Sequence, residues 1–429
     1  MLFLTLILGE KASAKMGNAA VALRSGGGLE LIRRMIVALW LALAAAAGEP
    51  RRIDVFVAGT HGYFTYRIPG IVVTPKGTVI AYAEARKTNA ADWGAIDIVT
   101  RRSEDGGASW LSQHAIGKVL RSLKQNPAAA SVARPPDAIT YNNPVAIVDR
   151  RKGIVHFLFC VEYMQAFYMR STDDGRTFSP PVEITSTFEK FRPEYPWKVI
   201  ATGPGHGIQL RNGRLIMPVW LSTADGGNPH RPNVVATIYS DDHGNNWRGG
   251  EIAVRTAGEV VNPNETVAEQ LADGKVMLNV RSPSPAHRRI VAVSEDGATK
   301  WSAPRFQQEL LEPVCFGSLV RYGRTSSRGP NRLLFVNPDN LERIAGHAEP
   351  GQSRDRRNLT VQLSEDDGAT WKVKRVLDPG WAGYSDINVA KDGTILCLYE
   401  RGEPNPKQLR IAALTLARFS LEWLTEPQR

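Results

Sequence analysis

Residues Ser364–Trp371 read S-E-D-D-G-A-T-W, and this eight-residue pattern returns along the chain. Written as S-x-D-x-G-x-x-[W/F], it also occupies Ser103–Trp110, Ser171–Phe178 and Ser240–Trp247. A degenerate copy at Ser294–Trp301 has Ala298 where the other copies have Gly. The five copies begin 68, 69, 54 and 70 residues apart, which indicates a chain built from a repeating unit.

Each copy follows a short run of strand-forming residues, such as N-L-T-V-Q-L before Ser364, and precedes another extended segment. The pattern therefore predicts a turn between two strands. At such a turn the Asp side chain accepts backbone N–H groups, the Gly adopts positive φ, and the aromatic ring packs beneath the hairpin. We accordingly interpret the repeated Asp residues as structural and not as acid or base groups.

Between the copies, short strands alternate with turn residues, as in G-T-V-I-A-Y-A-E (77–84) and G-R-L-I-M-P-V-W (213–220). Four-stranded units that repeat at this interval are typical of a β-propeller. Five marked units plus the unmarked stretch Tyr384–Leu424 make six. The predicted fold is all-β, a six-bladed β-propeller of four-stranded antiparallel blades, in a single domain over residues 48–429.

The composition excludes several classes of protein. Apolar residues make up 43% of the 429 residues, and 53 Lys and Arg face 43 Asp and Glu, so the chain is neither polar nor charged enough to be disordered. The net charge of +10 is spread along the chain without a polybasic run. We therefore expect a solvated basic surface and no nucleic-acid partner.

Residues 33–47 read R-R-M-I-V-A-L-W-L-A-L-A-A-A-A. Two Arg before an apolar run that ends in small residues are typical of a secretory signal, and the run is short for a membrane span. A buried helix is the competing interpretation, but the run has no polar face. We predict that residues 1–47 are an extension and signal peptide, with Met16 and Met35 as alternative starts, and that the mature chain is exported to the periplasm or the medium without a membrane span.

Three cysteines, Cys160, Cys315 and Cys397, lie in apolar surroundings. Buried free thiols are the favoured state, although export would permit one disulfide. The Cys and His residues do not have metal-ligand spacing, so neither a metal nor another cofactor is predicted.

A second signature, Y-R-I-P at Tyr66–Pro69, stands upstream of the first repeat copy. With the repeats, which are Asp-boxes, it makes essentially the whole chain after residue 52 resemble the bacterial and animal exo-sialidase (neuraminidase) family. Asp-boxes alone occur in other extracellular propellers, whereas the combination is specific. The resemblance implies a six-bladed propeller with a site at the centre of one face.

Three arginines are implied by the resemblance as a clamp for the carboxylate of the substrate. Guanidinium groups suit this task because they pair with carboxylates through two hydrogen bonds. Arg67 in Y-R-I-P, Arg281 in V-M-L-N-V-R-S and Arg357 in R-R-N-L-T-V match the family positions. The neighbouring Arg356 leaves the register of the third arginine open.

The resemblance also implies a tyrosine nucleophile and its base, an exception to the two-carboxylate scheme of most glycosidases. Tyr384, in A-G-Y-S-D-I, matches the nucleophile, and Glu265, in P-N-E-T-V, matches the base. A phenol suits this substrate, because a carboxylate nucleophile would be repelled by the substrate carboxylate. Glu269 is the alternative base, but its context is that of a strand residue.

The acid/base implied by the resemblance is Asp92, in the loop sequence A-D-W-G, while Asp97 belongs to the strand-like run that follows. Arg86 matches an additional arginine near the substrate carboxylate, and Glu400 matches a carboxylate that orients the first arginine. Both are equally compatible with surface ion pairs. We interpret His206, in G-P-G-H-G, as a structural or rim residue.

The expected function is that of an exo-α-sialidase, which removes terminal α-linked sialic acids from glycans, glycoproteins or glycolipids with retention through a tyrosyl-enzyme intermediate. One alternative is a trans-glycosidase, or a hydrolase for another nonulosonic acid. The other is a non-catalytic propeller that binds sialic acid. Such a lectin would keep the arginines but could lose Asp92, Glu265 or Tyr384, so the presence of all three favours an enzyme.

Overall fold

The computed structural model describes residues 48–323, 329–343, 355–403 and 410–427. From Pro50 onward they belong to one compact unit, Pro50–Arg429. The predicted signal segment, residues 33–47, lies outside the described residues.

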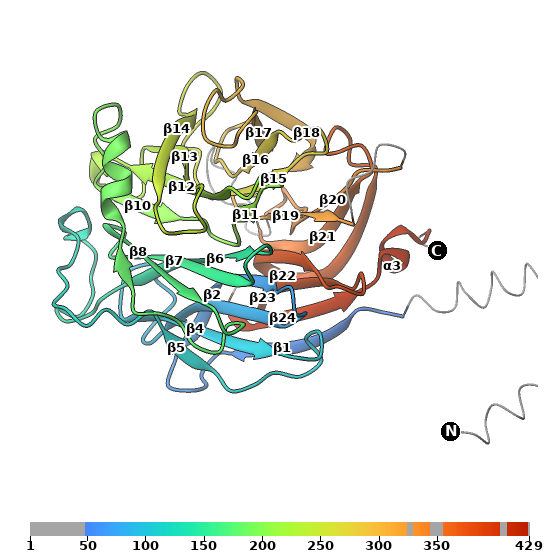
Figure 1. The fold of residues 1–429 in the computed structure, drawn as a ribbon, viewed down its shortest axis with the longest axis horizontal. Helices are drawn as coiled ribbons and strands as arrows, with labels where there is room; N and C mark the ends of the chain where they lie inside the picture. Colours follow the sequence, from blue (N-terminus) through green and yellow to red (C-terminus); the bar gives the residue numbers. More distant parts are fainter. Residues whose placement is uncertain (1–47, 324–328, 344–354, 404–409, 428–429) are drawn as a thin grey trace, which may run out of the picture. The chain divides into compact units, whose positions relative to one another are not determined.

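The described residues form five antiparallel sheets that follow one another along the chain (Figure 1). Three sheets have four strands each. They are β2 (Thr65–Val73), β3 (Val79–Arg86), β4 (Ile96–Ser103) and β5 (His114–Ile116); β6 (Tyr141–Asp149), β7 (Ile154–Val161), β8 (Gln165–Ser171) and β9 (Val182–Glu183); and β15 (Thr266–Gln270), β16 (Val276–Val280), β17 (Arg288–Ser294) and β18 (Arg305–Leu311).

The other two sheets are larger. One contains β10 (Val199–Thr202), β12 (Leu215–Ser222), β13 (Asn233–Ser240) and β14 (Arg248–Arg255), with β11 (Ile208–Gln209) paired to β12. The seven-stranded sheet has the spatial order β1 (Arg51–Val57), β24 (Ile411–Phe419), β23 (Ile395–Gly402), β22 (Val373–Val389), β21 (Arg357–Ser364), β20 (Arg332–Pro338) and β19 (Ser318–Tyr322). Its 17-residue strand β22 pairs with β21 through its first part and with β23 through its second.

Helices are short in the described part of the chain. Three are 3-10 helices, η1 (Pro127–Ala129), η2 (Thr185–Phe191) and η3 (Asp225–Gly227), and one is the α-helix α3 (Leu421–Thr425). None of the helices within the described ranges has the length and apolar content needed to cross a membrane.

Successive sheets pack face to face around a common centre. The innermost strands contact one another in turn, β2 with β6, β6 with β11, β11 with β15, β15 with β19, β19 with β22, and β22 with β2. Apolar side chains fill the space between neighbouring sheets; for example, Ile80 and Ile98 pack with Phe157 and Phe159 of the next sheet. This arrangement confirms the prediction of an all-β, propeller-like fold.

The first strand of the unit closes the ring, because β1 pairs with the last strand, β24. The N-terminal and C-terminal strands of the unit therefore belong to one sheet, and neither end can leave without exposing the edge of the other.

The Asp-box turns have the predicted structure. In the copy at Ser364–Trp371, the Asp366 carboxylate accepts hydrogen bonds from Ser364 Oγ (2.8 Å), Thr370 N (2.8 Å) and Thr370 Oγ1 (2.6 Å). Gly368 has φ +87°, and Trp371 is buried. The degenerate copy keeps the turn because Gly297, one residue earlier, takes positive φ and donates its N–H to Ser294 Oγ.

Partial desolvation raises the pKa of the Asp173 carboxyl, but hydrogen bonds from Thr177 and Ser171 outweigh it and lower the pKa to about 2. The same kind of turn lowers the pKa of Asp366. These carboxylates therefore act as fixed acceptors within turns, which confirms their structural interpretation.

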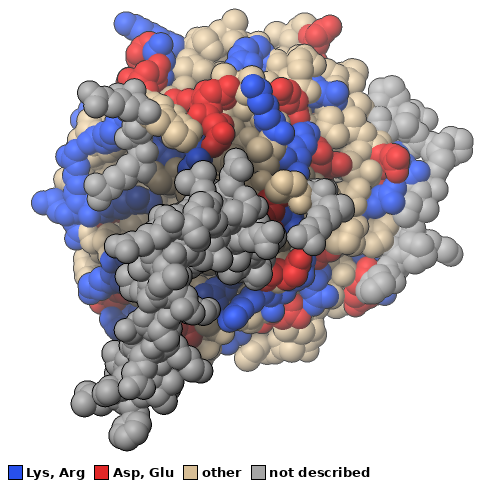
Figure 2. Space-filling view, turned by 90° about the vertical axis from the view of Figure 1, so that its right-hand side faces the viewer, with Lys and Arg blue, Asp and Glu red and all other residues tan. Residues whose placement is uncertain are grey.

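All three cysteines are free and buried. The expectation of buried thiols is therefore confirmed, and the alternative of a disulfide is not. On the face in Figure 2, Lys, Arg, Asp and Glu side chains lie intermixed among other residues over the visible area.

Replacing Asp366 with Ala should lower the free energy of unfolding by about 1–2 kcal/mol, because it removes the acceptor of three hydrogen bonds at a largely exposed turn. Urea denaturation checks this result. The matched control is Glu365→Ala, which removes the same charge from the adjacent position but breaks only an exposed ion pair with Arg332, for an expected loss below about 0.5 kcal/mol. Equal losses in the two variants would contradict the structural role of the Asp-box carboxylate.

Candidate active site

A pocket of about 250 Å³ opens where several inner strands begin. Five of the predicted site residues line it: Arg67, Asp92, Glu265, Arg281 and Tyr384. Two more contact these residues from behind, since Glu400 binds Arg67 and Arg86 lies 3.0 Å from Asp92. The eighth, Arg357, does not line the pocket.

Glu400 organises the floor of the pocket from a fully buried position. Its Oε1 accepts hydrogen bonds from Arg67 Nε (3.0 Å) and from the backbone N–H of Ile68 (3.2 Å). Its Oε2 accepts from the backbone N–H of Tyr384 (3.0 Å) and from Arg67 Nη2 (3.4 Å). One carboxylate thus fixes β2 and β22 at the residues that point into the pocket.

The backbone is irregular at both of these places. The register of β2 against β3 shifts between Arg67 and Gly70, and Ile68 has φ +56°, a rare conformation for a β-branched residue. The register of β22 against β23 shifts between Ala382 and Ser385. Strain of this kind persists only where surrounding contacts enforce it, and the N–H groups bound by Glu400 supply such contacts.

Tyr384 lies at the centre of a set of charged groups. Its hydroxyl donates to Glu265 Oε1 at 2.5 Å and accepts from Arg281 Nη1 at 2.6 Å. Arg281 also pairs with the other oxygen of Glu265. The guanidinium carbons of Arg356, Arg67 and Arg281 lie 5.2, 5.4 and 5.7 Å from the centroid of the Tyr384 ring.

These neighbours set the protonation state of the phenol. Burial raises the pKa of Tyr384, Arg281 lowers it and Glu265 raises it again, and the net pKa is well above the ordinary value. The free site therefore holds a neutral phenol in direct contact with a carboxylate that can remove its proton, and with guanidinium groups that can stabilise the phenolate.

Asp92 lies on the connection between β3 and β4, and its side chain is 47% exposed. Oδ1 of Asp92 is 3.0 Å from Arg86 Nη1 and 3.6 Å from Arg67 Nη1. Partial desolvation raises the pKa of this carboxyl, but Arg86 and then Arg67 outweigh it and hold the pKa well below its usual range. In the free site Asp92 is therefore an anion that occupies part of the cationic pocket.

Arg86 is held by a second buried carboxylate, Glu84. The Oε2 of Glu84 accepts hydrogen bonds from Arg86 Nε (3.1 Å) and Nη2 (2.7 Å), and its Oε1 accepts from the backbone N–H of Asn143 (2.8 Å). Asn143 has φ +51° and lies where β6 shifts register against β7. A buried carboxylate thus again connects an arginine to an irregular strand.

Of the two adjacent arginines that could be the third of the clamp, the pocket is lined by Arg356 and not by the predicted Arg357. Arg357 donates from Nη2 to Glu342 Oε2 (3.0 Å) away from the pocket. Arg356 lines the pocket, and its Nη2 donates to the carbonyl of Val314 (3.0 Å). The reason is local: Asn358 has φ +56° and β21 shifts register between Arg357 and Leu359, so strand alternation does not extend back to these arginines.

Asp97, Glu269 and His206, which were not assigned a catalytic role from the sequence, lie elsewhere. Asp97 is on β4, where it accepts a hydrogen bond from the Tyr63 hydroxyl (2.9 Å) and pairs with Lys87. Glu269 is on β15, as its context predicted, and faces a different pocket. His206 is buried and bound to Asp386, so it is a structural residue with respect to this site.

One wall of the pocket has no recognisable signature in the sequence. That wall includes Tyr163, Trp220 and His230 together with several amide side chains, namely Asn143, Asn228, Asn233 and Asn264. Trp93, next to Asp92, stacks near Tyr163 (4.7 Å between centroids) and His230 (5.5 Å) and so anchors the Asp92 loop. These residues come from strands and connections that are far apart in the sequence, so only the tertiary fold brings them together.

No group of three or more His, Cys, Asp or Glu side chains in the described segments is arranged to hold a metal ion. The charged groups of the pocket are instead arginines and isolated carboxylates, which suit an anionic ligand and proton transfer.

Residues 130–397 match the family of BNR repeat-like domains. The chain is 30% identical over 406 residues to a sialidase of Micromonospora viridifaciens, a match that covers 88% of this chain and 55% of the relative. It is 29% identical over 362 residues to a sialidase of Bacteroides fragilis (strain YCH46), covering 80% of this chain and 61% of the relative. The chain thus spans little more than half the length of these two relatives.

Among solved structures, the microbial sialidase called Hadza Hz136 superposes with a TM-score of 0.69 at 25% sequence identity. The superposition covers 87% of this chain and 69% of that structure. The sheets around the pocket therefore follow the same course in both proteins.

Replacing Glu400 with Gln should lower the free energy of unfolding by about 2–4 kcal/mol, because the partly buried Arg67 would lose its buried counter-charge. Chemical denaturation of the two proteins measures the difference. Glu342→Gln is the matched control, since it removes a carboxylate from an exposed pair with Arg357 and should cost less than about 1 kcal/mol. If the two substitutions cost the same, Glu400 does not organise the floor of the pocket.

Proposed function

Because the chain belongs to the sialidase family, with its BNR repeats, we propose that it is an exo-α-sialidase that hydrolyses terminal α-linked sialic acids of glycans, glycoproteins or glycolipids. One observation supports the proposal above all others. The Tyr384 hydroxyl contacts both Glu265 and Arg281 inside a pocket lined by further arginines. A phenol between a base and a cation is suited to nucleophilic attack on a substrate that carries its own negative charge.

Arg67, Arg281 and Arg356 would bind the substrate carboxylate, with Arg86 beside them. Three of these guanidinium groups surround one ring within 6 Å, and Glu400 and Glu84 hold Arg67 and Arg86 in place. Preorganised cations bind a carboxylate strongly because they need not be ordered when it arrives.

Asp92 would be the general acid and then the general base. In the free site its carboxylate lies against Arg86 and Arg67, the same groups that a substrate carboxylate would engage. A bound carboxylate would neutralise those arginines and free Asp92, whose pKa would then rise toward the value that a proton donor needs.

The reaction would proceed in two displacements with net retention. Glu265 takes the proton of Tyr384, the phenolate attacks the anomeric carbon, and Asp92 protonates the departing glycosidic oxygen. A water molecule, deprotonated by Asp92, then attacks the same carbon, the bond to Tyr384 breaks, and Glu265 returns the proton to the phenolate. At the end of the cycle Asp92, Glu265 and Tyr384 have regained the protonation states with which it began.

We also propose that the propeller has six blades. We infer that the seven-stranded sheet is two four-stranded blades that share β22. In support, residues of that strand between Val373 and Trp381 pair with β21, whereas residues between Ala382 and Val389 pair with β23. The catalytic domain would then extend over residues 48–429, and export through residues 33–47 stays a prediction from the sequence.

Replacing Asp92 with Ala should lower kcat for a natural sialoside by about 10²–10⁴-fold, since the leaving oxygen would depart unprotonated. The loss should be smaller for a fluorogenic aryl sialoside, whose leaving group needs less protonation. Asp97→Ala is the matched control and should retain nearly full activity with both substrates. Steady-state kinetics with the two substrates test the role of Asp92, and equal losses in the two variants would argue against it.

Arg356→Ala should lower kcat/KM by about 10–100-fold through the loss of a charge-assisted contact with the substrate carboxylate. Arg357→Ala, the adjacent arginine, should change kcat/KM less than about threefold, because its partner is an exposed glutamate. The reverse order of effects would restore Arg357 as the third arginine of the clamp.

A further inference from the structure

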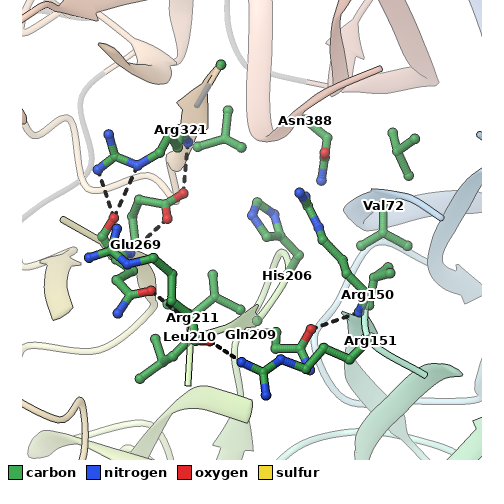
Figure 3. Close-up of a pocket in the computed structure, with 17 residues that line it drawn as sticks. Val72, Arg150, Arg151, His206, Gln209, Leu210, Arg211, Glu269, Arg321 and Asn388 are labelled. Atoms are coloured by element: carbon green, nitrogen blue, oxygen red, sulfur yellow. Dashed lines mark hydrogen bonds between the residues drawn. The ribbon is translucent and has the colours of Figure 1, made fainter. Parts of the chain in front are cut away.

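A second, larger hollow of about 380 Å³ lies at the opposite ends of the inner strands (Figure 3). Arg67 of β2 lines the active-site pocket, whereas Val72 of the same strand lines this hollow. In the same way Glu265, just before β15, lines the active-site pocket, and Glu269 on β15 lines the hollow. Four residues of an extended strand span roughly 13 Å. The two pockets are therefore separate and open at opposite ends of the inner strands.

Four arginines line this hollow, Arg150, Arg151, Arg211 and Arg321, whereas its acidic lining residue is Glu269. Three of the four are held by neighbouring groups. Arg151 donates to the carbonyl of Arg211, Arg211 donates to the carbonyls of Leu271 and Ala272, and Arg321 donates to the carbonyl of Gln270 and pairs with Asp367.

Arg150 differs from the other three. Its backbone N–H donates to Gln209 Oε1 (2.8 Å), which fixes the start of the side chain. The side chain then extends into the hollow toward His206 and Asn388 (Figure 3). Among the described residues its guanidinium group makes no hydrogen bond or ion pair, so an exposed cation is held in the hollow without a counter-charge.

His206 adds a second donor from a buried position, since only 5% of the residue is exposed. Its Nδ1 lies 2.8 Å from Asp386 Oδ1, and Asp386 is fully buried, where it also accepts from Ser318 Oγ (2.6 Å) and the backbone N–H of Ile71 (2.8 Å). Because Asp386 engages Nδ1, the other ring nitrogen, Nε2, is left for the hollow.

Two electrostatic effects favour a positive potential in the hollow. Burial lowers the pKa of His206, but Asp386 and Glu269 outweigh it, so the pKa is raised and the ring is more readily protonated. Burial raises the pKa of Glu269, whose oxygens accept from the backbone N–H groups of Gln270 and Arg321 (2.8 Å each). These two N–H groups, together with the nearby charge of Arg321, offset the negative charge of Glu269 toward an anion in the hollow.

We propose that this hollow binds a small oxyanion of the phosphate or sulfate type, with Arg150 and His206 as its direct ligands. A guanidinium group supplies two parallel N–H donors to such an anion, and an imidazolium Nε2–H supplies a third. The bound anion joins the turn after β6 to the segment before β11, and so connects two neighbouring sheets at the end of the ring opposite the active site. This site is independent of the proposed hydrolysis.

To test this, the full chain is titrated with inorganic phosphate at constant ionic strength. Calorimetry measures the affinity for phosphate, and the melting temperature reports the stabilisation that phosphate produces. Arg150→Gln should weaken phosphate binding by about tenfold or more and abolish the rise in melting temperature. Arg248→Gln removes an equal charge from the exposed strand β14 and should bind phosphate as the parent does. Both variants should hydrolyse sialosides at the parent rate.

The active site also contains cations, so inhibition of turnover by phosphate is measured in the same samples. The proposal requires Arg150→Gln to lose phosphate binding while any inhibition by phosphate stays unchanged. Binding should also weaken as the pH rises through the pKa of His206, a group faced by Asp386, Glu269 and Arg150. The proposal is overturned if the parent binds phosphate no better than chloride, or if Arg150→Gln and Arg248→Gln lose affinity equally.

Discussion

The rest of the site depends on the contacts that the Glu400 carboxylate makes. It is completely buried, and its two oxygens hold the Arg67 guanidinium together with the backbone N–H groups of Ile68 and Tyr384. A buried charge is costly unless every oxygen has partners, and here each has two. The contact also restricts the chain around it: a Cβ atom on Gly383 would lie 2.2 Å from Glu400 Oε2, so this position of β22 requires glycine. Arg67 and the backbone of Tyr384 are thus positioned by one group.

The same principle explains how a pocket of arginines can form inside a β-sheet protein. Glu84 holds Arg86 and the N–H of Asn143, and Glu265 pairs with Arg281. Arg67, Arg86 and Arg281 therefore each have a carboxylate to balance them, whereas Arg356 donates to the carbonyl of Val314. An anionic ligand meets donors that are already in place, which is the condition for strong electrostatic stabilisation of charge during a reaction. Asp92, on its loop, is the one acidic group of this set that a ligand carboxylate could displace.

The sequence predicts those parts of the molecule that are encoded locally. The Asp-box turns depend on residues within eight positions, so their hydrogen bonds follow from the motif. Seven of the eight predicted site residues lie in or directly behind the pocket, and each of them belongs to a short motif on a strand or on the loop beside it. Strand alternation cannot tell Arg356 from Arg357, because positive φ at Asn358 interrupts it next to these two residues. The aromatic and amide wall, with Tyr163, Trp220 and His230, and the cationic hollow around Arg150 are built by strands and connections that are distant in the sequence and meet only in the folded ring.

The proposed mechanism stands or falls with a covalent bond between Tyr384 and the substrate, and this bond can be trapped. The purified protein would be incubated with a fluorinated sialic acid donor that slows release of the covalent intermediate, then digested and analysed by mass spectrometry. If Tyr384 is the nucleophile, a single added sugar is expected on the peptide that contains Tyr384, and no label is expected in Tyr384→Phe. A label on Glu265 or on any other residue, or rapid turnover of natural sialosides by Tyr384→Phe, would contradict it.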